Sequence, residues 1–146
     1  MATEAIADPL LGDEGRVLGK GDGAWASFKR EFAPTKSRVS VLVNVVSGSV
    51  PQAQRDLYRE IEAWYPKGVQ EIFEGVRREV EQDDVLKKWL PPEQIANRLQ
   101  LIILDIRYPF PLPGKCVLTY RFDPNKPDWI VTIAEDYHVE WCGLGD

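Results

Sequence analysis

Residues 49–82 read SVPQAQRDLYREIEAWYPKGVQEIFEGVRREVEQ, and their large apolar residues recur at three- and four-residue spacing. This spacing places them on one face of a helix. The set comprises Leu57, Ile61, Trp64, Val69, Ile72, Phe73, Val76 and Val80. Such a face needs a partner surface, and the segments on both sides of it have the composition of β-strands. The stretch therefore predicts a long helix packed against a sheet.

Two prolines define the expected shape of this helix. Ser49 and Gln52 have capping-box spacing, and Pro51 falls in the first turn, where its missing N–H is not needed. Pro66 lies inside the helix, where proline removes a hydrogen bond and clashes with the preceding turn. Because the apolar phase continues across it, we expect a kink that keeps the phase rather than a break.

Three strands are expected before the helix, at residues 16–20, 25–32 and 37–46. The third is the clearest, because Val39, Val41, Val43 and Val45 alternate with their neighbours. Gly21, Asp22 and Gly23 predict a hairpin turn between the first two strands. Residues 1–8 are small, acidic and aperiodic, and we expect them to be frayed.

After the helix we expect short helical turns at residues 85–90 and 93–98. Strands are then expected at 99–107, 115–122 and 129–134, with a fourth at 137–142. A stiff proline-rich connector, residues 108–113, separates the first two of these strands. The order predicts one α+β domain over residues 1–146. Its sheet would be mostly antiparallel, with about six strands, and a long kinked helical segment would cover one face.

Composition narrows the classes of function. The 146-residue chain has a net charge of −5, which argues against a broad nucleic-acid surface. This acidity would suit a basic protein partner, and it is also common among cytosolic proteins that simply stay in solution. The N-terminus does not resemble a signal peptide, and no apolar run is long enough for a membrane span. We therefore expect a cytoplasmic protein with no membrane or nucleic-acid partner and no cofactor.

Asp136, His138 and Glu140 are the candidate site residues. In a strand these alternating side chains would share one face, where two carboxylates and an imidazole could bind a metal or perform acid–base catalysis. A solvated strand face, with Tyr137, Val139 and Trp141 in the core, explains the same pattern and is favoured. Cys116 and Cys142 are expected to be buried, inert thiols.

Several segments together resemble a family of small bacterial domains of unknown function. They are the opening Asp8, Pro9 and Gly12, then Trp25, the valine-rich strand, residues 55–76 (RDLYREIEAWYPKGVQEIFEGV) and residues 120–146 (YRFDPNKPDWIVTIAEDYHVEWCGLGD). In layout this is similar to immunity-type proteins that neutralise toxins. The resemblance implies protein binding and supplies no catalytic residue.

The leading hypothesis is therefore a non-enzymatic domain that binds another protein. Two alternatives remain open. One is an enzyme that uses Asp136, His138 and Glu140. The other is a small-ligand site between the helix and the sheet, lined by Trp64 or Trp89.

Overall fold

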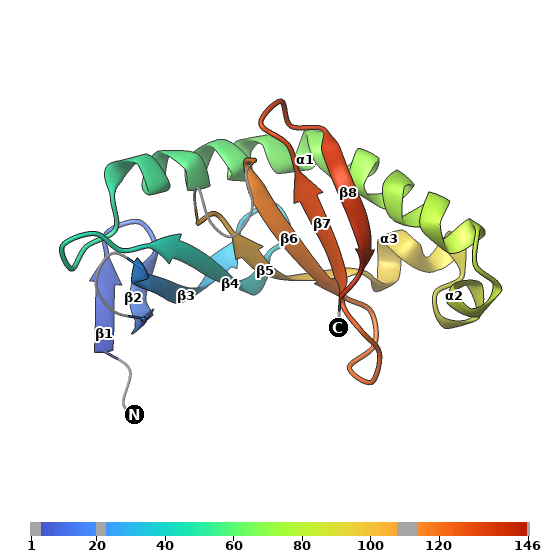
Figure 1. Ribbon diagram of the computed structural model, residues 1–146, viewed down its shortest axis with the longest axis horizontal. Helices are drawn as coiled ribbons and strands as arrows, with labels where there is room; N and C mark the ends of the chain where they lie inside the picture. The colour runs from blue at the N-terminus through green and yellow to red at the C-terminus, as the bar shows by residue number, and fades with distance from the viewer. Residues whose placement is uncertain (1–3, 20–22, 108–113, 146) are drawn as a thin grey trace.

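The computed structural model describes residues 4–19, 23–107 and 114–145, which form an α+β fold (Figure 1). Its eight strands follow one another across a single sheet in chain order. They are β1 (Glu4–Asp8), β2 (Gly12–Leu18), β3 (Trp25–Phe32), β4 (Ser37–Asn44), β5 (Gln100–Asp105), β6 (Cys116–Arg121), β7 (Trp129–Ile133) and β8 (Val139–Leu144). The α+β class is confirmed, whereas the prediction of about six strands is wrong. The predicted turn at residues 21–23 and the connector at 108–113 lie wholly or largely outside the described residues.

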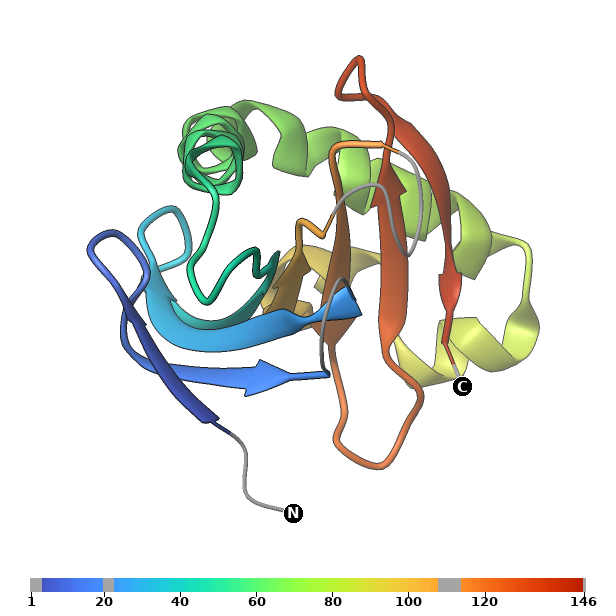
Figure 2. The same cartoon turned by 60° about the vertical axis from the view of Figure 1, so that its left-hand side comes forward.

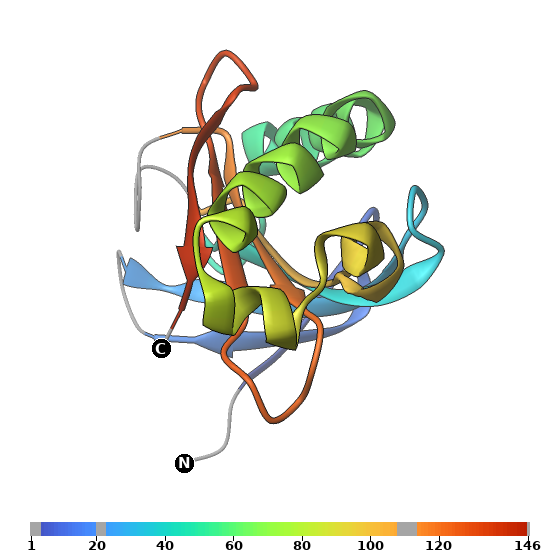
Figure 3. The ribbon, with the colours of Figure 1, turned by 90° about the vertical axis from the view of Figure 1, so that its right-hand side faces the viewer.

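All neighbouring strands are antiparallel except β4 and β5, which pair in parallel with Ser40 opposite Ile103. A parallel pair cannot be joined by a tight turn, and here the helix α1 (Gln52–Glu81) makes the crossover. The short helices α2 (Asp84–Trp89), η2 (Pro92–Gln94) and α3 (Ile95–Arg98) complete the connection to β5. Figure 3 shows the sheet curving around the helices, which lie on one side of it. None of the helices in the described ranges is both long and apolar enough to cross a membrane.

Strand β1 corrects the expectation that residues 1–8 are frayed, because residues 4–8 pair with β2. The carboxylate of Asp8 holds the turn between these strands by accepting hydrogen bonds from the backbone N–H groups of Leu10 (2.9 Å) and Leu11 (3.0 Å). It also forms an ion pair with Arg55 on α1, at 2.7 Å. The N-terminal hairpin is therefore tied to the helix by a contact that local sequence does not reveal.

Helix α1 continues through Pro66 without a break, as predicted. Figure 2 shows that it bends, since its first turns are seen almost end-on and its later turns run across the view. The predicted capping box does not form: the helix begins after Pro51 with no side-chain cap, and the Ser49 hydroxyl donates instead to the carbonyl of Val46.

The buried face of α1 is rotated in its first half relative to the prediction. Tyr58 and Tyr65 are buried, while Leu57 and Trp64 are only partly buried. A hydrogen bond contributes to this rotation in addition to apolar packing, because the Tyr65 hydroxyl lies 2.6 Å from the hydroxyl of Tyr120 on β6 inside the core. From Ile72 onward, the predicted face holds, although Phe73 is only partly buried.

No helix of the described residues lies on the face of the sheet opposite α1, and we call this the open face (Figure 3). Because side chains alternate along a strand, the residues between the core positions point to this face. Its partly buried or exposed apolar members include Leu18, Trp25, Leu42, Ile103, Val117, Ile130 and Trp141. Trp141 is 53% exposed, which is unusual for so large an apolar side chain.

Candidate functional site

The predicted row of Asp136, His138 and Glu140 does not form. Strand β8 begins only at Val139, and Tyr137 has a φ of 69°, so the alternation assumed for a strand is interrupted there. Asp136 lies in the turn before β8 and accepts a hydrogen bond from the backbone N–H of His138. All three side chains are exposed, and the residues that the structure describes contain no group of three or more potential metal ligands.

His138 instead fastens the β7–β8 turn to α1. Its Nδ1 lies 3.0 Å from a carboxylate oxygen of Glu71, whose other oxygen accepts a hydrogen bond from the backbone N–H of Val139 at 2.6 Å. The Glu71 hydrogen bond and the nearby carboxylate of Asp136 raise the pKa of His138. The backbone N–H of Val139, followed by His138, lowers the pKa of Glu71. This arrangement explains His138 as a structural tie.

The tryptophans expected to line a ligand site are also used in packing. The Trp64 ring lies 5.0 Å from the ring of Tyr137, and Lys126 lies 4.5 Å above the ring of Trp89. Neither tryptophan lines the cavity bounded by Lys29 and Arg121 or the cavity bounded by Gln70 and Ile95. In the described part of the chain, both tryptophans thus contribute ring contacts to the packing.

Neither cysteine resembles an activated nucleophile. Cys116 is buried, and burial together with the charge of Asp105 raises the pKa of its thiol. Partial burial and the charge of Glu79 likewise raise the pKa of Cys142. A reactive cysteine needs the opposite shift, because the thiolate is the nucleophile. The expectation of a fully buried thiol holds for Cys116, whereas Cys142 is only partly buried.

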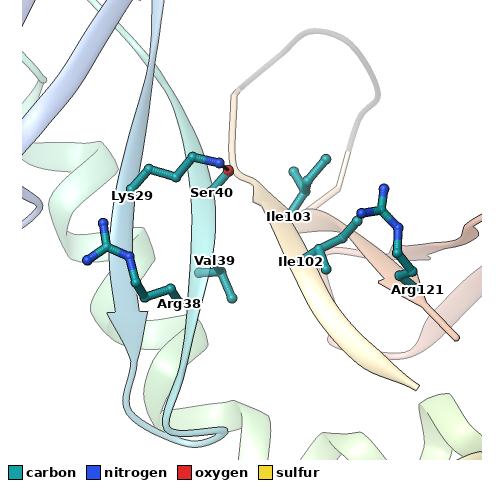
Figure 4. Close-up of a pocket in the computed structure, with 7 residues that line it drawn as sticks. All are labelled: Lys29, Arg38, Val39, Ser40, Ile102, Ile103 and Arg121. Atoms are coloured by element: carbon teal, nitrogen blue, oxygen red, sulfur yellow. Dashed lines mark hydrogen bonds between the residues drawn. The ribbon is translucent and has the colours of Figure 1, made fainter. Parts of the chain in front are cut away.

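A different site lies on the open face, where strands β3 to β6 form a cavity of about 450 Å³ (Figure 4). We call it the basic groove. It is lined by Lys29, Arg38, Val39, Ser40, Ile102, Ile103 and Arg121. In Figure 4 the cations Lys29 and Arg38 stand on one side and Arg121 on the other, with the two isoleucines between them. The groove thus combines an apolar floor with positive charge at both sides.

The sequence builds this floor through a bulge in β5. The register between β5 and β6 shifts between Leu101 and Ile103, so that Ile102 is an extra residue in the strand. A bulge re-aims side chains, and both Ile102 and Ile103 are consequently only partly buried. Across the parallel pair, Ile103 faces Ser40, whose small side chain leaves the space open.

The three cations of the groove interact with polar groups of the same chain, and these interactions differ in strength. The Lys29 ammonium donates a hydrogen bond to the Ser40 hydroxyl at 2.5 Å. Arg121 donates two hydrogen bonds to the carboxylate of Asp128, at 3.1 and 3.3 Å. Arg38 forms an ion pair with Glu14 in which each side chain is 62% exposed. Exposed pairs of this kind are weak because water and salt compete for both groups.

Comparison of the chain with protein-family models, with curated proteins and with solved structures gave no significant match. The chemistry of the groove is therefore argued from this chain alone. Sequence reasoning missed the groove, although the alternation in β6 places Arg121 opposite the core face. Alternation in β3 and β4 could also have placed Lys29, Arg38 and Ser40 on one face.

Proposed function

We propose that this protein is a non-enzymatic binding domain that takes another protein on the open face of its sheet, with the basic groove at the centre of the contact. The observation that carries the proposal is the groove itself, in which three cations surround two partly exposed isoleucines. Such a mixture of apolar floor and charged rim is the anatomy of a protein-binding surface. The exposed Trp141 on the same face would add an anchor of the type found at interface hot spots.

The shape of the groove favours a protein over a small molecule. Small-ligand sites enclose most of the ligand, whereas the basic groove is lined mostly by exposed and partly buried side chains of four neighbouring strands, with only Val39 buried. Nucleic acid is disfavoured because the described residues that line the groove include no aromatic side chain for base stacking, and because the chain has a net charge of −5. A protein segment can use both the isoleucine floor and the charged sides.

The charge of the groove suits an acidic contact surface on the partner, whereas the overall acidity of the chain suggested a basic one. Both remain proposals. Neutralisation of a toxin, as in immunity-type proteins, would be one form of such binding, and it rests on the sequence resemblance alone.

Photo-cross-linking from the groove tests the proposal. We would place p-benzoylphenylalanine at Ile103 in the groove or, as a control, at the exposed Arg59 on α1, and expose each protein to lysate of its source cells. We expect one defined protein to cross-link from Ile103 and not from Arg59. The cross-link should be lost when Lys29→Glu and Arg121→Glu are combined.

A charge-matched control separates the groove from general electrostatics. The pair Arg59→Glu and Lys67→Glu changes the net charge equally on exposed positions of α1, and it should leave the cross-link intact. A cross-link that survives the groove substitutions, or that also forms from Arg59, would contradict binding through this face.

A further inference from the structure

The two arginines of the basic groove are occupied by carboxylates of the same chain. Glu14 of β2 pairs with Arg38, and Asp128, just before β7, pairs with Arg121. Lys29 has no carboxylate partner among residues 4–19, 23–107 and 114–145, since its ammonium donates to the Ser40 hydroxyl. The unbound groove therefore holds one cation without an acidic partner and two that are already paired.

These internal pairs lie at least partly in contact with solvent. The Arg38–Glu14 pair is mostly exposed, whereas in the other pair the Arg121 side chain is 48% and the Asp128 side chain 25% exposed. Exposed ion pairs contribute little net stability, so a carboxylate that arrives with additional contacts can replace them. Arginine also accepts a new carboxylate readily, because its planar guanidinium offers several N–H donors in a fixed fork.

We infer that the natural occupant of the basic groove is an acidic protein segment that displaces Glu14 and Asp128, so that these two residues act as competitors within the chain. This inference rests on the proposed function and names the partner's chemistry. One apolar side chain of the segment lies on Ile102 and Ile103. Its carboxylates pair with Lys29, Arg38 and Arg121.

The internal carboxylates also explain how such a groove stays selective. Glu31 lies opposite Arg38 in the β3–β4 register, so a third acidic residue stands at the same side as Glu14. An arriving polyanion without apolar groups meets this acidic rim and gains nothing from the isoleucine floor. A segment that carries both carboxylates and an apolar side chain gains enough binding free energy to displace the internal carboxylates. The repulsion by these carboxylates thus selects against polyanions that lack apolar groups.

The inference makes opposite predictions for two sets of residues. Glu14→Gln and Asp128→Asn remove competitors, and each should tighten binding about two- to fivefold, as expected for the loss of an exposed ion pair. Lys29→Gln and Arg121→Gln remove attractive groups, and each should weaken binding about tenfold. If these polar residues only supported the fold, substitutions in either of the two sets would weaken binding or leave it unchanged.

A library of short random peptides displayed on phage provides the probe. Selection on the full-length protein should enrich peptides in which acidic residues flank a large apolar residue. The affinity of the enriched peptides is then measured by fluorescence anisotropy for the four variants. As a control for folding, thermal unfolding followed by circular dichroism should show the same melting temperature for each variant as for the wild type. Glu14→Gln and Asp128→Asn each test competition within the chain, so one variant is sufficient if the other misfolds.

The possible results separate the inference from the proposed function. Peptides that are not acidic but lose affinity in Lys29→Gln and Arg121→Gln would overturn the acidic occupant and leave binding at the groove intact. Peptides unaffected by all four substitutions would overturn both. Unchanged or weaker binding in Glu14→Gln and Asp128→Asn would refute competition within the chain. Failure to enrich acidic peptides, or displacement by single-stranded DNA at equal concentration, would also overturn the inference.

Discussion

The buried contacts of Asp8, which join the N-terminal hairpin to Arg55 of α1, predict a large loss of stability for Asp8→Ala. The Asp8 side chain is 1% exposed, and its carboxylate accepts from Arg55 at 2.7 Å and from two backbone N–H groups at 2.9 and 3.0 Å. Removal of one partner of a buried ion pair costs about 3–5 kcal/mol. Because the Arg55 side chain is 23% exposed and can regain water, we expect the lower end, about 3 kcal/mol.

The pH dependence of this loss provides a second readout. Burial pushes the pKa of Asp8 upward, but hydrogen bonds from Arg55, Leu11 and Leu10 outweigh it and hold the pKa below its ordinary value. A carboxylate with a lowered folded-state pKa stabilises the fold above its unfolded pKa of about 3.9, and this contribution disappears as the pH falls through the folded-state value. The difference between wild type and Asp8→Ala should therefore be full near neutral pH and shrink in acid.

Urea unfolding at neutral and acidic pH measures both effects. Asp13→Ala, at an exposed carboxylate in the same hairpin, serves as the matched control and should change stability by less than about 0.5 kcal/mol. A decrease in the free energy of unfolding of less than about 1 kcal/mol for Asp8→Ala would refute this role of the Asp8–Arg55 ion pair. So would a difference that does not shrink as the pH falls.

Two further predictions concern the β7–β8 turn and the N-terminal hairpin. Glu71→Gln should lower the pKa of His138 in an NMR titration, because the Glu71 hydrogen bond is the main cause of its raised value. In the wild type the contribution of His138 to stability is full below its unfolded pKa of about 6.5, and it is lost as the pH rises through the higher folded-state pKa. An unchanged titration would contradict the tie. Gly15→Ala would place a methyl group 2.6 Å from the backbone oxygen of a β1 residue and 2.5 Å from the Phe28 ring. We expect a loss of about 1–3 kcal/mol in thermal unfolding, whereas Gly23→Ala, with no atom within 4 Å, should cost far less.

The sequence predicted those elements whose signal is local. The apolar period of α1 and the valine alternation of β4 are properties of neighbouring residues, and both elements form as expected. Strand β1 carries no such signal, because it is short and acidic and depends on the contact of Asp8 with Arg55, 47 residues away. The rotated face of α1 has a similar origin, since the Tyr65 hydroxyl meets that of Tyr120, which lies 55 residues away on β6.

The candidate site shows the same division. Asp136, His138 and Glu140 would share a face only if the strand began before Asp136, and the positive φ of Tyr137 prevents this. The groove could not be located from sequence because its two sides meet through the parallel register of Ser40 with Ile103. That register joins residues more than 60 positions apart, and the bulge that exposes Ile102 likewise depends on strand pairing.

Mapping of a selected acidic peptide onto the isotope-labelled protein by NMR tests binding at the basic groove most directly. We predict that the largest chemical-shift changes occur at the backbone amides of Ser40, Ile103 and Arg121, which come from three neighbouring strands. The exposed side of α1, including Arg59 and Lys67, should remain unchanged. Changes confined to α1 or to the β8 edge, with the groove amides unaffected, would contradict the account.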